Sequence, residues 1–531
     1  MARSKKSEQH GPVRRLSILR LLVALVVTSG LIGGGVVGWQ YYSAQASSPA
    51  AGSWFAGYVD VTATPSFAFE TPAVSAGKQV MLSFVVASKS APCTPSWGGS
   101  YSLDEASASL DLDRRIARLQ DSGGVVAVSF GGQKNSELAT TCTSVSELAQ
   151  AYLGVIDRYN LSTIDLDLEG TALLDSQAND RRAEALAQVQ QQRRDAGHPL
   201  AIWLTLPVTS TGLAVEGQQA VAATLARKVD IAGVNAMTMD YGNSLTHGMT
   251  MLTASEDALT ALQRQLGVLY LRAKITLTQS TLWSKVGATP MIGQNDDAGE
   301  IFTLSDAAKF NQFAKSHGVG RMSMWSLNRD LTCGSNYTTL DIESDSCSGV
   351  NQGAQHYATV LSHGFTGSVD ANAKSVTKTQ KVSTKALKDD PKTSPYPIWS
   401  ATDSYLQGTK IVWHHNVYVA KWWTEGDLPD NPVLNSWETP WQLIGPVLPG
   451  EKPITPVTVP AGTFPAWAGT SIYNKGDKVL FNGLPYQSKW WTQGDSPAQA
   501  SSDPDSSPWT PLTVAQINAI NQQLKAASGG N

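Results

Sequence analysis

Short apolar runs alternate with longer amphipathic segments through the first two thirds of the chain. The runs are rich in Val, Ile, Leu, Met and aromatic residues, which is typical of strands buried on both faces, and the segments between them show helical spacing. The predicted strands are Trp54–Val61, Gln79–Ala87, Val125–Phe130, Thr163–Leu168, Leu200–Pro207, Ile231–Met239, Lys285–Met291 and Arg321–Ser326. The predicted helices are Asp104–Leu119, Ser144–Tyr159, Ser176–Asp195, Glu216–Lys228, Ser255–Leu271, Leu304–His317 and Val350–His363.

Eight predicted strands that alternate with helices favour a fold of the α/β class, a parallel (β/α)8 TIM barrel, over an open sheet. In such a barrel one face of each strand points into the packed interior and the other faces the helices. Functional residues lie at the carboxyl ends of the strands.

The predicted fourth strand carries three alternating carboxylates, Asp165, Asp167 and Glu169. Because successive side chains point to opposite faces of a strand, the three share one face. One interpretation is the acidic outer face of a surface strand, and the other is a catalytic group. The barrel favours the second, since the apolar residues between the acids suit the helix side. The carboxylates then point inward, where charge is costly unless it is paired or used.

A basic segment precedes an uncharged apolar run, Leu21–Trp39, near the start of the sequence. This run is long enough to span a bilayer, and Ala44-Gln45-Ala46 resembles a signal-peptide cleavage site. We therefore expect either an uncleaved membrane anchor or a long signal peptide. Both place the following domains outside the cell.

The C-terminal part is rich in tryptophan, with 10 of the 16 Trp after Pro395. These residues belong to a repeat with a period of 68, in which Trp399 matches Trp467, Tyr418 matches Tyr486, Trp422-Trp423 matches Trp490-Trp491 and Trp441 matches Trp509. Units this small have little core. So many aromatic residues therefore indicate an exposed platform on which sugar rings stack. Trp441 and Trp509 are expected in the cores, and at least one Trp of each adjacent pair is expected at the surface.

These patterns predict several domains. They are a basic N-terminus with a signal peptide or anchor (1–46), a barrel (51–370), a linker (371–395), a first module (396–447), a Pro-rich linker (448–463), a second all-β module (464–513) and a C-terminal tail (514–531).

Charged residues make up 16% of the 531 residues and the formal net charge is −4, so the composition gives no sign of nucleic-acid binding. Four cysteines without a Cys-x-x-Cys pair argue against a zinc ribbon, and an even number suits two disulfides in an exported chain. Of three possible pairings we favour Cys93–Cys142 with Cys333–Cys347, because the second closes a short loop. We expect no metal or cofactor, since no His cluster offers a site.

The barrel resembles the chitinases of glycoside hydrolase family 18. Ser129-Phe130-Gly131-Gly132 matches the Ser-x-Gly-Gly signature of the third strand, and the residues from Asp165 to Glu169 match the Asp-x-Asp-x-Glu core of the fourth. Met237–Tyr241 resembles the Met-x-Tyr-Asp motif of the sixth strand, and Trp325 falls where the eighth strand supplies a tryptophan floor. Thr289–Asp296 is similar to the seventh-strand end of a bacterial subgroup. The C-terminal repeats resemble the chitin-binding modules of carbohydrate-binding families 5 and 12.

The resemblance implies retaining, substrate-assisted hydrolysis of β-1,4 linkages between N-acetylglucosamine units of chitin. It implies that Glu169 protonates the glycosidic oxygen, that Asp167 stabilises the substrate's acetamido group, and that Asp165 shares a proton with Asp167 and orients it. The implied substrate contacts are Ser129, Gly131, Gly132, Met237, Met239, Gln294 and Trp325 in the barrel, and Trp422, Trp423, Trp490, Trp491, Tyr418 and Tyr486 in the modules.

Two positions depart from the family pattern. Ser162 stands where the longer fourth-strand motif has an aspartate, and Met239 replaces the tyrosine that normally contacts the acetamido carbonyl. Tyr241 lies two residues further on, so in a regular strand it would share that face and supply the hydroxyl. Asp240 would face away unless the strand is already ending. Both Asp240 and Tyr241 are kept as candidate catalytic residues.

Two other functions stay open at this point. One is a non-catalytic or weakly active cell-surface protein that binds chitin or another glycan, although such proteins typically lack the terminal Glu of the motif. The other is an endo-glycosidase acting on different glycans that contain N-acetylglucosamine, against which the chitin-type modules argue. The expected partners are chitin or chitooligosaccharides and, through the N-terminal segment, a membrane. We expect a monomer.

Overall fold

The computed structural model describes residues 52–246, 248–335, 337, 342–372, 388–453, 457–498, 500 and 506–528. Two compact units, Met1–Gln380 and Lys381–Asn531, make up the chain. The apolar run predicted as an anchor or signal peptide lies outside the described residues. None of the helices in the described part of the chain combines the length and the apolar character that a membrane span requires.

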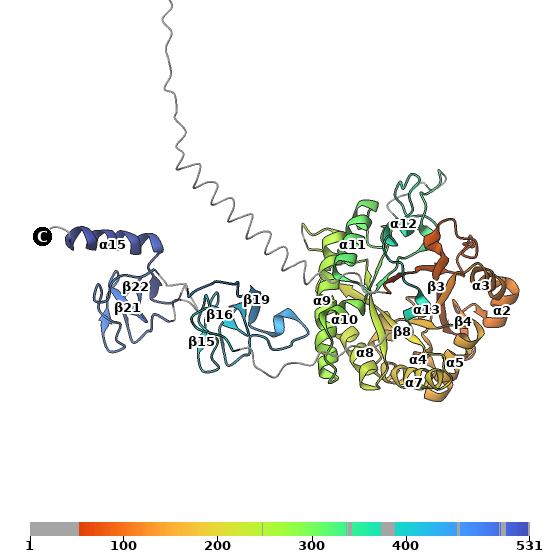
Figure 1. Cartoon of the computed structure of the whole chain (residues 1–531), viewed down its shortest axis with the longest axis horizontal. Helices are drawn as coiled ribbons and strands as arrows, with labels where there is room; N and C mark the ends of the chain where they lie inside the picture. Colours follow the sequence, from red (N-terminus) through yellow and green to blue (C-terminus); the bar gives the residue numbers. More distant parts are fainter. Residues whose placement is uncertain are drawn as a thin grey trace, which may run out of the picture. The chain divides into compact units, whose positions relative to one another are not determined.

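A closed ring of parallel strands forms the centre of the first unit (Figure 1). Around the ring, β1 pairs with β14, then β11, β10, β8, β7, β6, β3 and β2 follow. Because β1 and β2 are consecutive pieces of one segment, the ring closes, consistent with the predicted TIM barrel. The strands are β1 (Trp54–Phe55), β2 (Gly57–Asp60), β3 (Gln79–Ala87), β6 (Val125–Gly131), β7 (Thr163–Asp167), β8 (Ala201–Thr209), β10 (Ile231–Thr238), β11 (Val286–Pro290) and β14 (Arg321–Met322).

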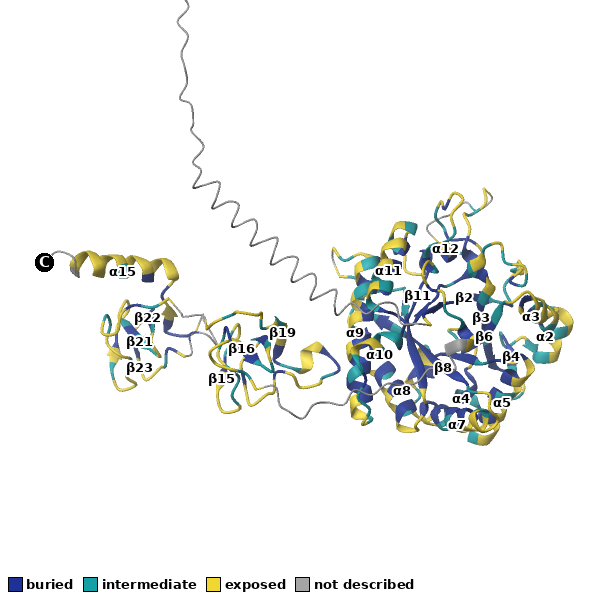
Figure 2. Ribbon diagram, viewed as in Figure 1, coloured by how far each residue is buried: buried dark blue, intermediate teal, exposed yellow. Residues whose placement is uncertain are grey.

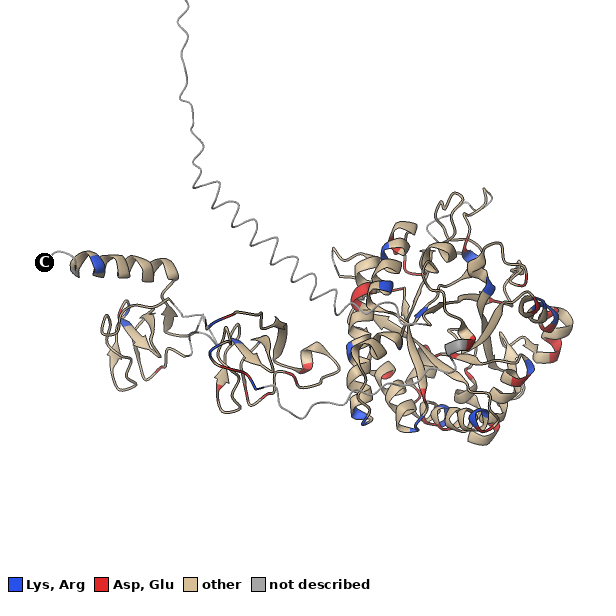
Figure 3. Ribbon diagram, in the orientation of Figure 1, with Lys and Arg blue, Asp and Glu red and all other residues tan. Residues whose placement is uncertain are grey.

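Helices surround this ring and carry both signs of charge on their outer faces (Figure 3). They include α2 (Leu103–Ser109), α3 (Leu112–Asp121), α5 (Val145–Arg158), α7 (Ser176–Asp195), α8 (Val215–Ala226), α9 (Met251–Arg272), α10 (Gln279–Ser284), α11 (Leu304–His317) and α12 (Tyr357–Leu361). Shorter helical segments are α4 (Leu138–Thr141), α6 (Gly170–Leu174) and α13 (Val369–Asn372). Two predicted helices differ. The segment from Asp104 to Leu119 is split into α2 and α3, because Asp111 adopts a left-handed conformation with φ of 51°. The predicted Val350–His363 helix is reduced to the five residues of α12.

Both faces of the central strands are buried, while the outer faces of the helices are exposed (Figure 2). Inside the barrel, Trp54, Tyr58, Met81 and Trp203 form a core with small residues from neighbouring strands. The predicted disulfides are both present, Cys93–Cys142 and Cys333–Cys347, with Cα–Cα distances of 4.6 and 5.0 Å. The continuous apolar runs therefore mark strands covered on two sides, as expected for a parallel sheet.

Two small β modules of the same topology make up most of the second unit. Each contains a two-stranded and a three-stranded antiparallel sheet. The first has β15 (Ser404–Tyr405), β16 (Lys410–Trp413), β17 (Asn416–Ala420), β18 (Thr424–Glu425) and β19 (Trp441–Pro446), and the second has β20 (Ile472–Tyr473), β21 (Lys478–Phe481), β22 (Leu484–Ser488), β23 (Thr492–Gln493) and β24 (Trp509–Pro511). The predicted tail forms a helix, α15 (Val514–Ser528), whose Ile517 packs against Val459 and Leu512.

Candidate active site

Asp165 lies at the centre of the barrel and accepts hydrogen bonds from four other strands. Its Oδ2 accepts from the hydroxyls of Tyr58 (2.9 Å) and Ser129 (2.7 Å). Its Oδ1 accepts from the hydroxyl of Thr205 (2.6 Å) and from the guanidinium of Arg321 (2.5 Å). Since the donors come from β2, β6, β8 and β14, the side chain points into the barrel, as the alternation predicted. The hydroxyl of Ser129, predicted as a substrate contact, is therefore used to hold Asp165.

Two glycines of the third strand allow the backbone at Asp167 to approach closely. Gly131 has φ of +105°, and a Cβ added there would lie 2.0 Å from the carbonyl oxygen of Asp167. Gly132 has φ of +87°, its N–H donates to that same carbonyl, and an added Cβ would lie 2.9 Å from the ring of Phe84. Any larger side chain would displace the carboxylate strand. The Gly131-Gly132 pair thus positions β7.

Asp167 and Glu169 form a pair of carboxyls, and neither has an ion pair with a cationic side chain among the described residues. Asp167 is buried, and its Oδ1 has no hydrogen-bond partner among the described residues. Burial, and then the charges of Glu169 and Asp165, raise the pKa of Asp167 well above its usual value. Burial and the carboxylate of Asp240 raise the pKa of Glu169 to about 7. One of the two carboxyls therefore carries a proton near neutral pH, which suits acid catalysis.

A pocket opens above this pair at the carboxyl ends of the strands, where a barrel enzyme places its chemistry. Trp325 stacks on Phe84 with a centroid distance of 5.5 Å and forms an aromatic surface of the pocket. The lining residues are Tyr58, Phe84, Gln133, Asp167, Glu169, Thr205, Met237, Met239, Asp240, Thr289, Met291, Asp296 and Trp325. Of the predicted residues, Glu169, Asp167, Met237, Met239, Asp240 and Trp325 thus meet in one pocket.

Tyr241 does not lie in this pocket. The strand β10 ends at Thr238, and Asp240 has φ of 47°, so the alternation expected from a regular strand breaks here. The Tyr241 hydroxyl donates to Ser255 on α9 at 3.2 Å, and the carboxylate of Glu300 accepts the backbone N–H groups of Tyr241 and Gly242. The expectation that Tyr241 replaces the missing hydroxyl is therefore wrong, because its hydroxyl points to Ser255 and its side chain does not line the pocket.

Asp240 takes the place at the pocket that the strand pattern gave to Tyr241. Its Oδ1 accepts the N–H of Asp296 at 2.8 Å, and its own N–H donates to Asn295 at 3.2 Å. Burial, and then the charge of Asp296, raise the pKa of Asp240 to about 6. Asp240 and Asp296 thus add negative charge beside Glu169.

Gln294 lies away from the pocket. It is buried in β12 (Gly293–Gln294), where its side chain donates to the carbonyl of Asn295 and its own carbonyl accepts from Arg329. The predicted substrate contact is not supported, since this side chain is used within the loop.

The paired tryptophans of the modules are all exposed. Trp422 and Trp423 are 44% and 53% exposed, and Trp490 and Trp491 are 43% and 58% exposed. Lys421 and Lys489 each place an ammonium 4.6 Å from the ring centroid of the following Trp. Trp437, which the repeat did not single out, is also exposed in the first module.

Tyr418 and Tyr486, predicted as binding residues, lie in the cores of the modules instead. Both are buried, Tyr418 with Ile411 and Trp441, and Tyr486 in the equivalent core of the second module. In such short strands the alternation separates two faces but does not tell which one packs on the core. Trp441 and Trp509 are core residues, as predicted.

No free metal-ligand cluster was found among the described residues. The one group of suitable side chains within bonding distance of each other is Cys93, Cys142 and Glu147, and its two cysteines form a disulfide.

Known proteins resemble both units of the chain. A probable bifunctional chitinase/lysozyme of Escherichia coli (strain K12) is 36% identical over 261 residues, which are 48% of this chain and 28% of that protein. Endochitinase 11 of Metarhizium anisopliae is 37% identical over 223 residues, 41% of this chain and 42% of that protein. A catalytic-site mutant of active domain 2 of the thermostable chitinase from Pyrococcus furiosus, complexed with chito-oligosaccharides, has a TM-score of 0.50 at 27% identity, covering 60% of this chain and 96% of that structure.

The barrel is thus similar in sequence and fold to these chitinases. A model of carbohydrate-binding module family 5/12 matches residues 466–510, within the second module. The chain spans less than half the length of either curated relative.

Sequence reasoning missed several residues of the candidate site. Tyr58, Thr205 and Arg321 surround Asp165 but come from three other strands. The only local signal was a basic residue, Arg321, at the start of an otherwise apolar predicted strand.

Proposed function

We propose that the barrel hydrolyses β-1,4 linkages between N-acetylglucosamine units of chitin with retention of configuration. The observation that carries this proposal is the Asp167–Glu169 pair, a buried and a half-buried carboxyl beside an aromatic pocket. Both have raised pKa values, and neither forms an ion pair with a described residue. Such an arrangement costs stability, so its presence indicates a functional use. The curated chitinase relatives support the choice of substrate.

Glu169 is the proposed general acid, because its pKa of about 7 leaves it partly protonated at neutral pH. Its proton goes to the glycosidic oxygen, and the bond from that oxygen to the anomeric carbon breaks. The acetamido oxygen of the substrate attacks that carbon from the opposite face and forms an oxazolinium ion. Asp167 stabilises its positive charge. Water, deprotonated by Glu169, then opens the ring and restores the sugar with retained configuration.

Met237, Met239 and Trp325 line the pocket and offer apolar surface for the sugar ring and the acetamido methyl group. Gly131 and Gly132 serve indirectly by positioning β7. Asp240 and Asp296 raise the pKa of Glu169.

The two C-terminal modules are proposed to hold the barrel on insoluble chitin. The exposed pairs Trp422-Trp423 and Trp490-Trp491 offer flat faces for sugar rings, and the first module shares the strand pairing of the matched second one. Tethering raises the local concentration of polymer at the barrel. Two disulfides and a carbohydrate-binding module further indicate a secreted protein. An uncleaved N-terminal anchor would keep this protein at the cell surface.

The decisive experiment compares the parent chain with Glu169→Gln on soluble chitin oligomers, with product lengths and anomeric configuration resolved. We expect the parent to release β-anomeric products and the variant to lose about 10²–10⁴-fold in rate while still binding oligomers. A parent that binds chitin but does not cleave it would establish the sugar-binding alternative. Cleavage of N-glycans or peptidoglycan in preference to chitin would establish the other glycosidase.

The role of the modules is tested by deleting residues 396–531. Activity on insoluble chitin should fall, and hydrolysis of short soluble oligomers should be unchanged. Substituting Trp422, Trp423, Trp490 and Trp491 by alanine should reproduce the loss, whereas equal losses on both substrates would contradict the tethering role.

A further inference from the structure

Three buried hydroxyls of the described residues line the pocket, and two of them use their hydrogen inside the barrel. The hydroxyls of Tyr58 and Thr205 both donate to Asp165, at 2.9 and 2.6 Å. The third belongs to Thr289 on β11, whose side chain is buried as well. It accepts a hydrogen bond from Asn235, and no described residue accepts one from it. Thr289 therefore brings an unused donor to the pocket.

The side-chain amide of Asn235 fixes this role of the Thr289 hydroxyl. The amide nitrogen donates to the hydroxyl oxygens of Thr205 at 3.0 Å and of Thr289 at 2.7 Å. Because Thr205 gives its own hydrogen to Asp165, it has to accept from Asn235, so the amide atom between the two threonines is the nitrogen. The Thr289 hydroxyl can then take part in that contact only as an acceptor. Its hydrogen is left for a ligand.

The surroundings of Thr289 are apolar on the side of the pocket. Thr289 pairs in register with Met237 on β10, and Met239 and Met291 line the same pocket. A buried donor without an acceptor costs stability, so its presence points to a ligand that accepts from it. The pocket also contains Oδ1 of Asp167, which has no hydrogen-bond partner among the described residues. One unused donor and one unused acceptor thus belong to one pocket.

A secondary amide carries one N–H donor and one carbonyl acceptor, and it therefore matches this pair of groups. The acetamido group of N-acetylglucosamine is such an amide. We propose that the Thr289 hydroxyl, oriented by Asn235, donates a hydrogen bond to the carbonyl oxygen of the substrate's acetamido group, whose N–H is met by Asp167. The proposal rests on the proposed hydrolytic function and adds a substrate-binding residue to it. Met239 offers no donor for this bond. A bond from Thr289 orients the carbonyl oxygen for its attack on the anomeric carbon.

The test measures kcat/KM of the full chain on two short soluble oligomers of N-acetylglucosamine, one unmodified and one in which sulfur replaces the acetamido oxygens. Thr289→Val removes the donor and keeps the shape, so kcat/KM on the unmodified oligomer should fall by about threefold to tenfold. Sulfur is a weak acceptor, so on the sulfur oligomer the variant should match the parent. Thr289→Ser keeps a hydroxyl and should restore the parent values on both oligomers.

Thr238→Val is the matched control. Thr238 is a buried threonine on β10 whose hydroxyl also has no partner among the described residues, but it does not line the pocket. Its removal should leave kcat/KM at the parent value on both oligomers.

Equal losses of Thr289→Val on the two oligomers overturn the proposal, because a merely structural role lowers both values alike. No loss on the unmodified oligomer, or a loss in Thr238→Val as large as in Thr289→Val, overturns it as well. If Thr289→Val does not fold, Thr289→Cys, which has a weaker donor, takes its place in the same comparison. A parent inactive on the unmodified oligomer refutes the proposed function itself, whereas an active parent with equal losses refutes only the role of Thr289.

Discussion

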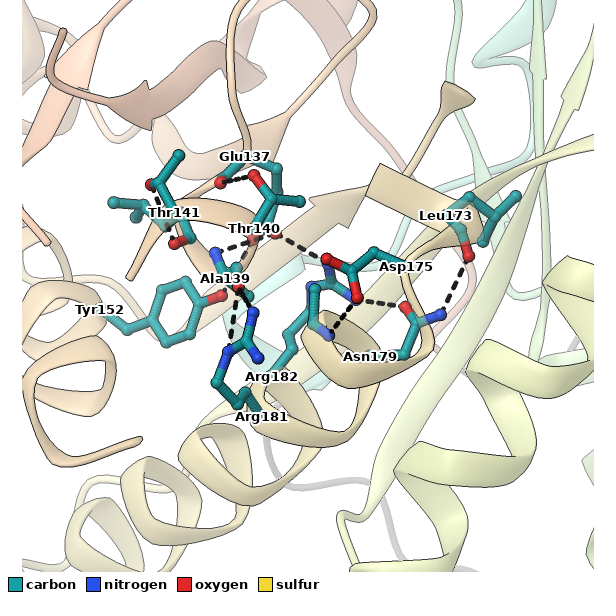
Figure 4. Close-up of polar contacts among 12 residues, drawn as sticks. Glu137, Ala139, Thr140, Thr141, Tyr152, Leu173, Asp175, Asn179, Arg181 and Arg182 are labelled. Atoms are coloured by element: carbon teal, nitrogen blue, oxygen red, sulfur yellow. Dashed lines mark hydrogen bonds and ion pairs between the residues drawn. The ribbon is translucent and has the colours of Figure 1, made fainter. Parts of the chain in front are cut away.

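Glu137 and Asp167 are two buried acidic residues that both lie close to Gly131, yet their surroundings are opposite. A Cβ added to Gly131 would lie 3.5 Å from Cγ of Glu137 and 2.0 Å from the carbonyl oxygen of Asp167. Glu137 forms an ion pair with Arg182 at 2.7 Å and accepts hydrogen bonds from Tyr152 and the backbone of Ala139 (Figure 4). Asp167, just as buried, has another acid as its neighbour.

This difference separates a group that maintains the structure from one that performs chemistry. The ion pair of Glu137 joins the loop after β6 to α7, and its carboxylate is satisfied by three donors. Asp167 keeps one oxygen without a partner among the described residues and a raised pKa. A buried acidic group with an unsatisfied oxygen costs stability, so its presence here indicates a functional use.

The largest effect is expected at the paired carboxylate. Glu137→Gln removes the partner of Arg182 and leaves an unpaired buried cation, so the free energy of unfolding should fall by about 3–5 kcal/mol. The measurement is chemical denaturation followed by tryptophan fluorescence. Below the unfolding transition kcat should change little, because the Glu137 carboxylate does not line the pocket.

The double substitution Glu137→Gln with Arg182→Met is the control for this prediction. It removes the unpaired cation and should recover part of the lost stability. A single variant with normal stability and a low kcat would break the comparison, since Glu137 would then behave as a catalytic group.

Asp167→Asn should show the reverse pattern. The rate on chitin oligomers should fall by about 10²–10³-fold, because the neutral amide cannot stabilise the positive charge of the intermediate. Stability at neutral pH should stay equal or rise. The folded pKa of Asp167 is raised, so the native state binds more protons than the unfolded chain and loses stability as pH increases above about 4, the unfolded value. The variant lacks this loss. A destabilised variant with normal kcat would place Asp167 with Glu137 among structural groups.

The sequence predicted the features that depend on local alternation. The strands around the ring, the inward direction of Asp165 and Asp167, and the core positions of Trp441 and Trp509 all follow from periods of two residues and from composition. The pairing of Cys333 with Cys347 followed from their short separation.

Features that depend on distant contacts or on single dihedral angles could not be predicted in this way. Arg321 and Asp165 are 156 positions apart, and only barrel closure brings them together. The left-handed conformation of Asp240 sends Tyr241 toward Ser255, although a regular strand would direct it to the pocket. Tyr241 fits the local alternation, but a single backbone angle at the preceding residue changes the direction of its side chain.

A smaller effect is expected on the pH dependence of the unpaired carboxyls. Asp240, whose pKa is about 6, is largely ionised where Glu169 titrates, near pH 7. Its negative charge favours the protonated form of Glu169, so Asp240→Asn should lower the pKa of Glu169. The general acid is then lost earlier as pH increases, and the alkaline limb of kcat/KM should move to lower pH. Asp296→Asn should act in the same direction but less. An alkaline limb that moves upward would contradict this electrostatic account.

The smallest effect is expected for Tyr241→Phe, which distinguishes a motif residue from a site residue. Its hydroxyl donates to Ser255 in a buried contact away from the pocket, and the carboxylate of Glu300 accepts its backbone N–H. Removing the hydroxyl loses one hydrogen bond, so stability should fall by about 0.5–1.5 kcal/mol while kcat and the pH profile stay unchanged. Denaturation and oligomer hydrolysis measure the two quantities. A tenfold drop in kcat at normal stability would contradict this prediction and would show that the Tyr241 hydroxyl takes part in catalysis.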